Sequence, residues 1–493
     1  MRAAASLRWI SRTAGTLATC LVVAACSTAP PADPVQALET TGERAPNHMA
    51  AVEALSKQDP LSKSASNALK RTLNGSGYNN DVRKAAFNVL AEKDRKVLED
   101  ALEVSIVRME NYEFRRWIIE QIGKRDMKDF TVVLLNSWIQ PLPHWGMDDR
   151  ERPEYAAMVE MYGTAHASDP SKAPLDTGVT DALFAVLQNS SPVTQAALRA
   201  RTWELLMRLG QRERLRELVH SAALRPDDAM LKDIKQLSDD LGILPETREE
   251  LIWLGKLRMT ASPAFWKMAS DALKLVPEEQ KRNFELRGIT VAVAAAKYKP
   301  ELLKKTTDEL YALVAAQLKS RGAGKYSPNF QGFGEGHTEM LGEQRDQICW
   351  IDLMAIVLAM DLTDQPAIRA KLFDVADRDQ QDRRTEYGGV VRLSDKGEYE
   401  VVEVRPRMTG SDVRYEASQE AFDEGYTALF HFHMHAQEYE NSRYAGPHLG
   451  DFAYAASSRA NCLVFSFVKR DALDVDFYRH GPVVVDLGTI PRG

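Results

Sequence analysis

Cysteine is scarce in this chain, and no two cysteines have metal-site spacing. Cys20, Cys26, Cys349 and Cys462 are the only four in 493 residues, and none belongs to a C-x-x-C pair. A cysteine-based zinc module is therefore excluded. Cys349 and Cys462 both lie in apolar runs, so we expect buried free thiols there. One disulfide between them is the alternative.

An excess of basic residues is also lacking. The chain has 63 Lys and Arg against 70 Asp and Glu, a net charge of −7. The first 25 residues carry three arginines and no acid, so without them the balance is 60 against 70, or −10. A chain this acidic has no general basic surface, and we expect no nucleic-acid partner. The glycines of 322–343 do not follow a strand pattern, so no phosphate-binding loop is expected either.

The apolar run at the N-terminus is too short to cross a membrane. Arg2, Arg8 and Arg12 precede it, and it ends in small residues at Cys26, which is the layout of a secretory signal. The stretch VAAC resembles a bacterial lipobox, in which the cysteine becomes lipidated. We expect a signal peptide over 1–25 and a lipid anchor on Cys26, with ordinary signal cleavage as the alternative. The resemblance implies a place in the cell envelope, and Ser27 after the cysteine, rather than Asp, resembles lipoproteins sent on to the outer membrane, facing the periplasm.

Helical periodicity extends from 47 to 377, after a flexible tether over 26–46 that is rich in Pro, Ala and Thr. Within it, DVRKAAFNVLAEKD (81–94) and EFRRWIIEQIGKRD (113–126) align at an offset of 32 residues. Each is followed by another amphipathic stretch. Helix pairs with such a period are typical of stacked α-solenoids, and these two resemble HEAT-type repeats. We therefore expect a solenoid-like helical domain with a surface for protein partners.

The spacing of apolar residues changes after Asp377 from the period of a helix to that of a strand, which predicts a second domain over 378–493. Five short apolar or alternating runs follow: EYGGVVRLSD, EYEVVEVRPRM, YTALFHFHMHA, NCLVFSFVKR and VDFYRHGPVVVDLG. Helices are expected at SQEAFDEGY and at 452–459. The whole chain is thus predicted to be mostly α, with a small α/β domain at its end.

Three histidines alternate in the third of these runs, at positions 431, 433 and 435. A strand would place all three on one face, where two imidazoles at i and i+2 can bind one metal ion and the third is too far along. Asp451, after a glycine-rich turn, can supply a third ligand, and Glu386 a general base. A polar sheet surface without metal is the alternative.

The order of these residues resembles that of the JAMM or MPN metalloproteases, whose JAB-type domains have a cytidine-deaminase-like α/β fold. Glu386 precedes small residues at an early strand, His433-Met434-His435 matches the His-x-His that ends a strand, and Asp451 matches the third ligand. The resemblance covers residues 380 to 493 and implies Zn²⁺ on His433, His435 and Asp451, with Glu386 as base. His431 is then expected to support the site or lie on the surface.

Three departures from the family pattern fall between His435 and Asp451, and the first is Ala436, which stands where the family commonly has proline. His448 stands where the family has a serine, and 12 residues separate His435 from His448, more than is usual. The His448 imidazole can donate a hydrogen bond to an oxyanion, act as an extra ligand, or mark altered chemistry. His337 and His480 are isolated in the sequence and are expected to be structural.

The resemblance implies hydrolysis of an amide bond. At the expected location, the available substrates are envelope proteins and the cross-linked peptides of the cell wall. We therefore expect an envelope-anchored zinc metallopeptidase or isopeptidase, whose helical body presents substrate or partners. The alternative is a catalytically inactive lipoprotein scaffold that binds protein partners through its solenoid.

Overall fold

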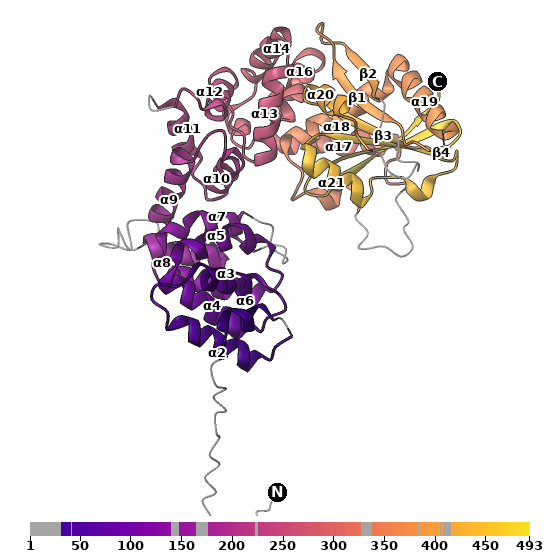
Figure 1. Cartoon of the computed structure of the whole chain (residues 1–493). Helices are drawn as coiled ribbons and strands as arrows, with labels where there is room; N and C mark the ends of the chain where they lie inside the picture. The colour runs from indigo at the N-terminus through magenta and orange to yellow at the C-terminus, as the bar shows by residue number, and fades with distance from the viewer. Residues whose placement is uncertain are drawn as a thin grey trace, which may run out of the picture. The chain divides into compact units, whose positions relative to one another are not determined.

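A computed structural model of the chain describes residues 31–40, 42–139, 147–163, 176–221, 225–326, 338–382, 384–404, 407 and 416–493 (Figure 1). The predicted signal peptide, Cys26 and His337 lie outside these residues. The described chain is mostly helical and ends in a small domain with a six-stranded sheet, so the predicted fold class is confirmed at this level. Among the described helices, none is both long and apolar enough to cross a membrane.

Contacts divide the chain into two compact units. One comprises residues up to 142 together with 151–161, and the other comprises 143–150 and 162–493. The helices from 176 onward therefore share a compact unit with the sheet, whereas the change in sequence periodicity falls at 377.

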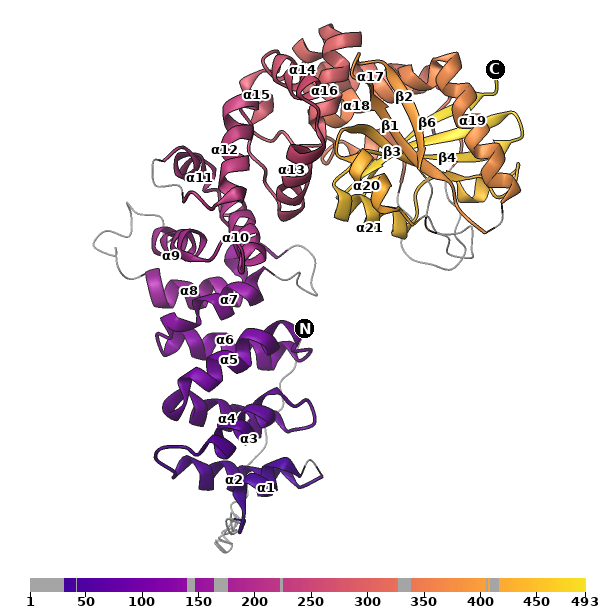
Figure 2. The ribbon, with the colours of Figure 1, turned by 45° about the horizontal axis from the view of Figure 1, so that its top comes forward.

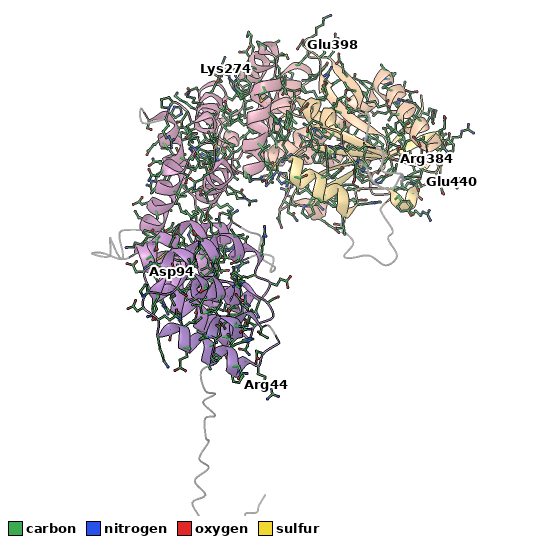
Figure 3. All side chains as sticks on the ribbon, viewed as in Figure 1. Arg44, Asp94, Lys274, Arg384, Glu398 and Glu440 are labelled. Carbon is green, nitrogen blue, oxygen red and sulfur yellow. The ribbon has the colours of Figure 1, made fainter. Side chains whose placement is uncertain are left out.

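The first unit consists of short helices that pack on one another in chain order, as Figure 2 shows for the successive layers from α1 and α2 to α7 and α8. Its helices are α1 (Pro34–Glu39), α2 (Ala45–Ser56), α3 (Lys63–Asn74), α4 (Asn80–Lys93), α5 (Arg95–Ser105), α6 (Tyr112–Lys124), α7 (Thr131–Trp138) and α8 (Pro153–Tyr162). Asp94, labelled in Figure 3, ends α4 and caps α5, because its carboxylate accepts the Val97 N–H.

The two segments that align in the sequence form α4 and α6, and their matched residues occupy matched places. Val82 and Phe114 are both buried, and so are Arg83 and Arg115. The Arg83 guanidinium lies over the Phe114 ring, 3.9 Å from its centroid. The arginine that recurs with the period is thus part of the packing between neighbouring layers.

The second unit contains thirteen of the described α-helices and all six described strands. The helices are α9 (Asp176–Asn189), α10 (Ala196–Arg208), α11 (Arg212–His220), α12 (Ala229–Leu241), α13 (Arg248–Thr260), α14 (Pro263–Leu273), α15 (Glu278–Lys281), α16 (Gly288–Tyr298), α17 (Thr307–Arg321), α18 (Trp350–Asp364), α19 (Pro366–Gln381), α20 (Gln419–Gly425) and α21 (Leu449–Ser458). The strands are β1 (Gly388–Leu393), β2 (Tyr399–Val404), β3 (Ala428–His435), β4 (Cys462–Lys469), β5 (Ala472–Arg479) and β6 (Val483–Pro491).

The sheet has the strand order β2-β1-β3-β4-β5-β6. The β3–β4 pair is parallel and is connected through α21, while the other neighbouring pairs are antiparallel. One strand prediction is wrong: the run VDFYRHGPVVVDLG is a hairpin of β5 and β6, not a single strand. Gly481, with a φ of 76°, makes the turn between them.

The two faces of the sheet differ in polarity because side chains alternate along each strand. Phe430, Phe432 and Met434 of β3 point to the face packed against the α16–α19 layer, where Phe467 of β4 meets Phe373 of α19. The histidines of β3 point to the opposite face, which α20 and α21 contact. Cys349 and Cys462 are both free thiols, half-buried and buried respectively.

A buried ion cluster joins the helices of the second unit to its sheet. The Asp352 carboxylate of α18 accepts Arg287 Nη1 at 2.7 Å and Arg479 Nη2 of β5 at 3.0 Å. The Asp352 side chain is 0% exposed and also accepts the Cys349 N–H. Burial would raise the pKa of Asp352, but the two guanidinium groups outweigh it and lower that pKa to about 2.

We predict that Asp352→Ala lowers the free energy of unfolding by about 3–5 kcal/mol, because it leaves the buried Arg479 guanidinium without its anion and the buried Arg287 guanidinium with Glu285 alone. The matched control is Asp364→Ala at the end of the same helix, where a side chain 62% exposed pairs with Arg321. Urea titration should show little change for that variant. Equal effects of the two substitutions would contradict the prediction.

Since the pKa of Asp352 is depressed in the folded chain, its contribution to the free energy of unfolding should be lost as the pH falls from about 4 toward 2.

Candidate metal centre

Strand β3 brings its histidines beside Glu386, which lies just before β1. In the antiparallel β1–β3 pair, Gly388 is opposite His433, so Glu386 comes level with the end of β3 at His435. The Tyr387 carbonyl accepts the Met434 N–H, and this contact fixes the segment. A Cβ on Gly389 would lie 2.1 Å from the Val402 carbonyl oxygen, which explains the glycine at this position.

Helix α21 supplies the other two predicted residues from its first turn. His448 is the N-cap, and the Asp451 carboxylate accepts the His448 backbone N–H at 2.7 Å. This bond folds the Asp451 side chain back over the helix start, beside the imidazoles of β3. The His448 ring lies 4.5 Å from the His435 ring, centroid to centroid.

The predicted residues therefore converge on one point. The Nε2 atoms of His433 and His435 are 3.2 Å apart. Asp451 Oδ1 lies 3.4 Å from His433 Nε2, and Asp451 Oδ2 lies 3.8 Å from His435 Nε2. Glu386 Oε1 is 3.5 Å from His435 Nε2 and 3.9 Å from His433 Nε2. Two overlapping sets of three side chains each have the spacing of metal ligands: Glu386, His433 and His435, and His435, His448 and Asp451.

The second nitrogen of each imidazole has its own hydrogen-bond partner. His435 Nδ1 donates to the Tyr444 carbonyl at 2.8 Å, and His433 Nδ1 lies 3.4 Å from the Tyr478 hydroxyl. With its proton on Nδ1, the His435 ring turns an unprotonated Nε2 toward His433. A cation or a proton can therefore lie between the two Nε2 atoms, which are 3.2 Å apart.

The charge state of the cluster favours metal binding. Burial, together with the nearby His433, lowers the pKa of His435 to about 3, so its imidazole is neutral at neutral pH. Burial would raise the pKa of Asp451, but His433, His435 and the His448 N–H hold it well below its usual range. A neutral imidazole and an ionised carboxylate are the forms that bind metal ions.

The cluster opens into a cavity of about 780 Å³. Besides the predicted residues, Phe422, Tyr454 and Tyr478 contribute aromatic walls, and Arg407 also lines it. A cavity of this size accommodates a small molecule or a short piece of peptide. The candidate ligands are thus buried and yet reachable.

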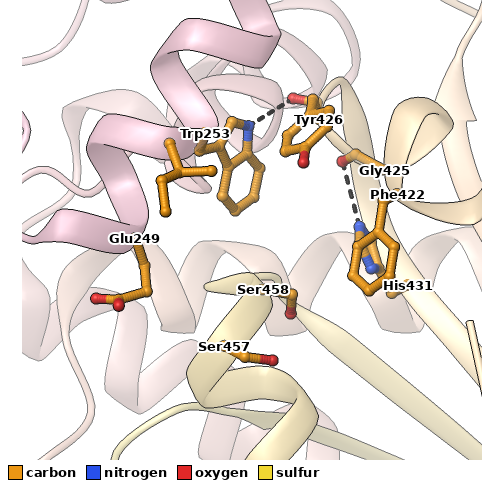
Figure 4. Close-up of a pocket in the computed structure, with 9 residues that line it drawn as sticks. Glu249, Trp253, Phe422, Gly425, Tyr426, His431, Ser457 and Ser458 are labelled. Atoms are coloured by element: carbon orange, nitrogen blue, oxygen red, sulfur yellow. Dashed lines mark hydrogen bonds between the residues drawn. The ribbon is translucent and has the colours of Figure 1, made fainter. Parts of the chain in front are cut away.

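His431 is on the same face of β3 but takes no part in the cluster. Its Nδ1 pairs with the Tyr454 hydroxyl at 2.7 Å and its Nε2 with the Gly425 carbonyl at 3.2 Å. Figure 4 shows the imidazole against Gly425 in a separate pocket of about 100 Å³, which Trp253 also lines. Burial lowers the pKa of His431 to about 4. His480 pairs with Glu285 at 2.7 Å, away from the cluster.

Two residues that orient the imidazoles were missed in the sequence. Tyr444 acts through its backbone carbonyl, for which no side-chain pattern gives a signal. Tyr478 lies in the run VDFYRHGPVVVDLG, and only the pairing of β4 with both β3 and β5 brings it opposite the histidines.

Comparison of the chain with protein-family models, curated proteins and solved structures finds no match.

We predict that Tyr478→Phe weakens divalent-metal binding about 10- to 100-fold, because it removes the group that orients His433 through Nδ1. The matched control is Tyr454→Phe, whose hydroxyl pairs with His431 instead. Competition with a chelator of known affinity for Zn²⁺ measures both. If the two variants bind Zn²⁺ as tightly as the unchanged chain, Tyr478 has no orienting role.

Proposed function

We propose that the second unit is a zinc-dependent amide hydrolase, with His433, His435 and Asp451 as the metal ligands. The observation that carries this proposal is the pair of Nε2 atoms that face each other beside a carboxylate. Ligands at about 2.0–2.1 Å from a tetrahedral zinc ion lie about 3.3 Å from one another. The His433–His435 distance of 3.2 Å and the His433–Asp451 distance of 3.4 Å fit that value.

Glu386 is proposed as the general base. Its carboxylate is buried and faces both imidazoles at 3.5 and 3.9 Å, about as near to them as Asp451 at 3.4 and 3.8 Å. A zinc ion, when bound, would supply a Lewis acid that polarises an amide carbonyl and acidifies water. Glu386 would take the proton of the attacking water and pass it to the leaving amine.

His448 would stabilise the oxyanion in place of the serine of the JAMM and MPN metalloproteases. Its imidazole is in the wall of the same cavity and next to His435. An N–H donor aimed at developing negative charge contributes strongly in a site screened from water. The order of Glu386, the His-x-His pair and Asp451 in the chain supports a relationship to this family.

The substrate is proposed to be a protein or a cell-wall peptide. The cavity has room for a short extended segment around the scissile amide. A lipid anchor on Cys26 would place the enzyme at the cell envelope, and the stacked helices of the first unit would hold a partner or the substrate, as HEAT-like repeats do.

We predict close to one zinc ion per chain in the form that begins at Ser27, measured by elemental analysis. The double variant His433→Ala/His435→Ala should contain none, because it lacks both imidazole ligands. Its folding is checked by circular dichroism. No zinc in the unchanged chain, even after zinc is offered, would refute the hydrolase and favour the scaffold.

We predict further that Glu386→Gln keeps its zinc but loses hydrolysis about 10²- to 10⁴-fold, the usual contribution of a general base. New amino groups released from purified cell-wall peptides and from envelope proteins, identified by mass spectrometry, are the measurement. A zinc-loaded chain that releases the same products with and without this substitution would show that the activity does not come from this site.

A further inference from the structure

A second group of carboxylates lies on the polar face of the sheet. Asp474 and Asp476 alternate along β5, and Asp476 is opposite Asp486 of β6. One oxygen atom from each of the three lies within 4.8 Å of the others, and all three residues are at most 1% exposed. Charged side chains are almost never buried this completely without a counter-charge.

Among the described residues, no cationic side chain pairs with Asp474 or Asp476. Within the described part of the chain, neither oxygen of Asp474 has a hydrogen-bond partner, although the side chain is directed into the group. The Gly446 backbone approaches Asp476, but no hydrogen bond of normal geometry reaches its oxygens from the described residues either. Asp486, by contrast, accepts the backbone N–H groups of Gly324 and Gly488, which favour its ionised form.

The three carboxylates destabilise one another as they stand. Burial raises the pKa of Asp474 and of Asp476 well above the ordinary value, and the neighbouring carboxylates, Glu339 among them, raise it further. Either protonation of the carboxylates or a bound cation would remove this electrostatic repulsion. Oxygens that bind one Ca²⁺ ion at 2.3–2.6 Å lie at most about 5 Å from one another, and the three carboxylates here meet that limit, because one oxygen of each lies within 4.8 Å of the others.

We propose that Asp474, Asp476 and Asp486 form a second metal site, which binds a hard divalent cation of the Ca²⁺, Mg²⁺ or Mn²⁺ class. The donors are all oxygens, whereas the histidine cluster offers imidazole nitrogens, so the two sites differ in the metal that they prefer. A +2 ion would offset most of the negative charge, and backbone carbonyls or water can complete its coordination.

This site is distinct from the histidine cluster but close to it. Strand β4 lies between β3, which carries the histidines, and β5, which carries Asp474 and Asp476. In the sheet register, His435 and Asp474 are both opposite Ser466. The loop before α21 reaches both sites. The Tyr444 carbonyl accepts a hydrogen bond from His435 Nδ1, and the Gly446 backbone lies near Asp476. An ion there would stabilise the β5–β6 hairpin and the loop that orients His435.

The test uses the metal-free chain that begins at Ser27, with CaCl₂, MgCl₂ and MnCl₂ added separately. At least one salt should bind at one ion per chain by calorimetry and raise the midpoint of thermal unfolding by several degrees. Asp474→Asn/Asp476→Asn should abolish both effects. These isosteric changes remove unpaired buried charge, so the metal-free variant should unfold at the same temperature as the unchanged chain or higher.

His433→Ala/His435→Ala is the control that separates the two sites, and it should keep the response to the hard cation. Failure of the zinc experiment thus leaves this proposal standing, and the reverse holds too. The proposal is overturned if none of the three cations shifts the midpoint of the unchanged chain, or if the Asp474→Asn/Asp476→Asn variant responds equally. Protonation of the carboxyls would then account for their burial.

Discussion

The register of β3 is the constraint on which the site depends. This strand is paired on both sides, antiparallel to β1 and parallel to β4, and all eight of its residues are buried. Its phenylalanines fill the apolar layer beneath the sheet, while its histidines point to the other face. A slip of one residue would exchange the two sets and bury three imidazoles among apolar side chains. The hydrophobic core therefore fixes which face of the sheet the histidines occupy, and Tyr444 and Tyr478 then orient their rings.

The parts of the fold that could be predicted are those that the local periodicity of apolar residues encodes. Alternation in YTALFHFHMHA predicted both a strand and a common face for its histidines, and the turn before Asp451 indicated a helix start nearby. Strands β5 and β6 were merged, although Gly481-Pro482 between their apolar runs is a local turn signal.

Long-range contacts account for what could not be predicted. Asp352 and Arg479 are 127 positions apart, so no window of sequence relates them. The carboxylates of β5 and β6 read as ordinary polar residues of alternating strands, and only the pairing of the two strands brings Asp476 opposite Asp486. The same holds for Tyr478. Local patterns thus identify which residues can do chemistry, while strand order decides which of them meet.

The contact between His435 and Tyr444 has a consequence for how this chain can vary. The acceptor is a main-chain carbonyl, which also accepts the Ser466 hydroxyl. Substituting the Tyr444 side chain leaves that oxygen in the chain, so the orientation of the imidazole is insensitive to most point mutations in the loop. It is sensitive to loop length, because removing residues between His435 and Tyr444 would withdraw the carbonyl. Related chains should therefore tolerate substitutions in this loop far better than deletions.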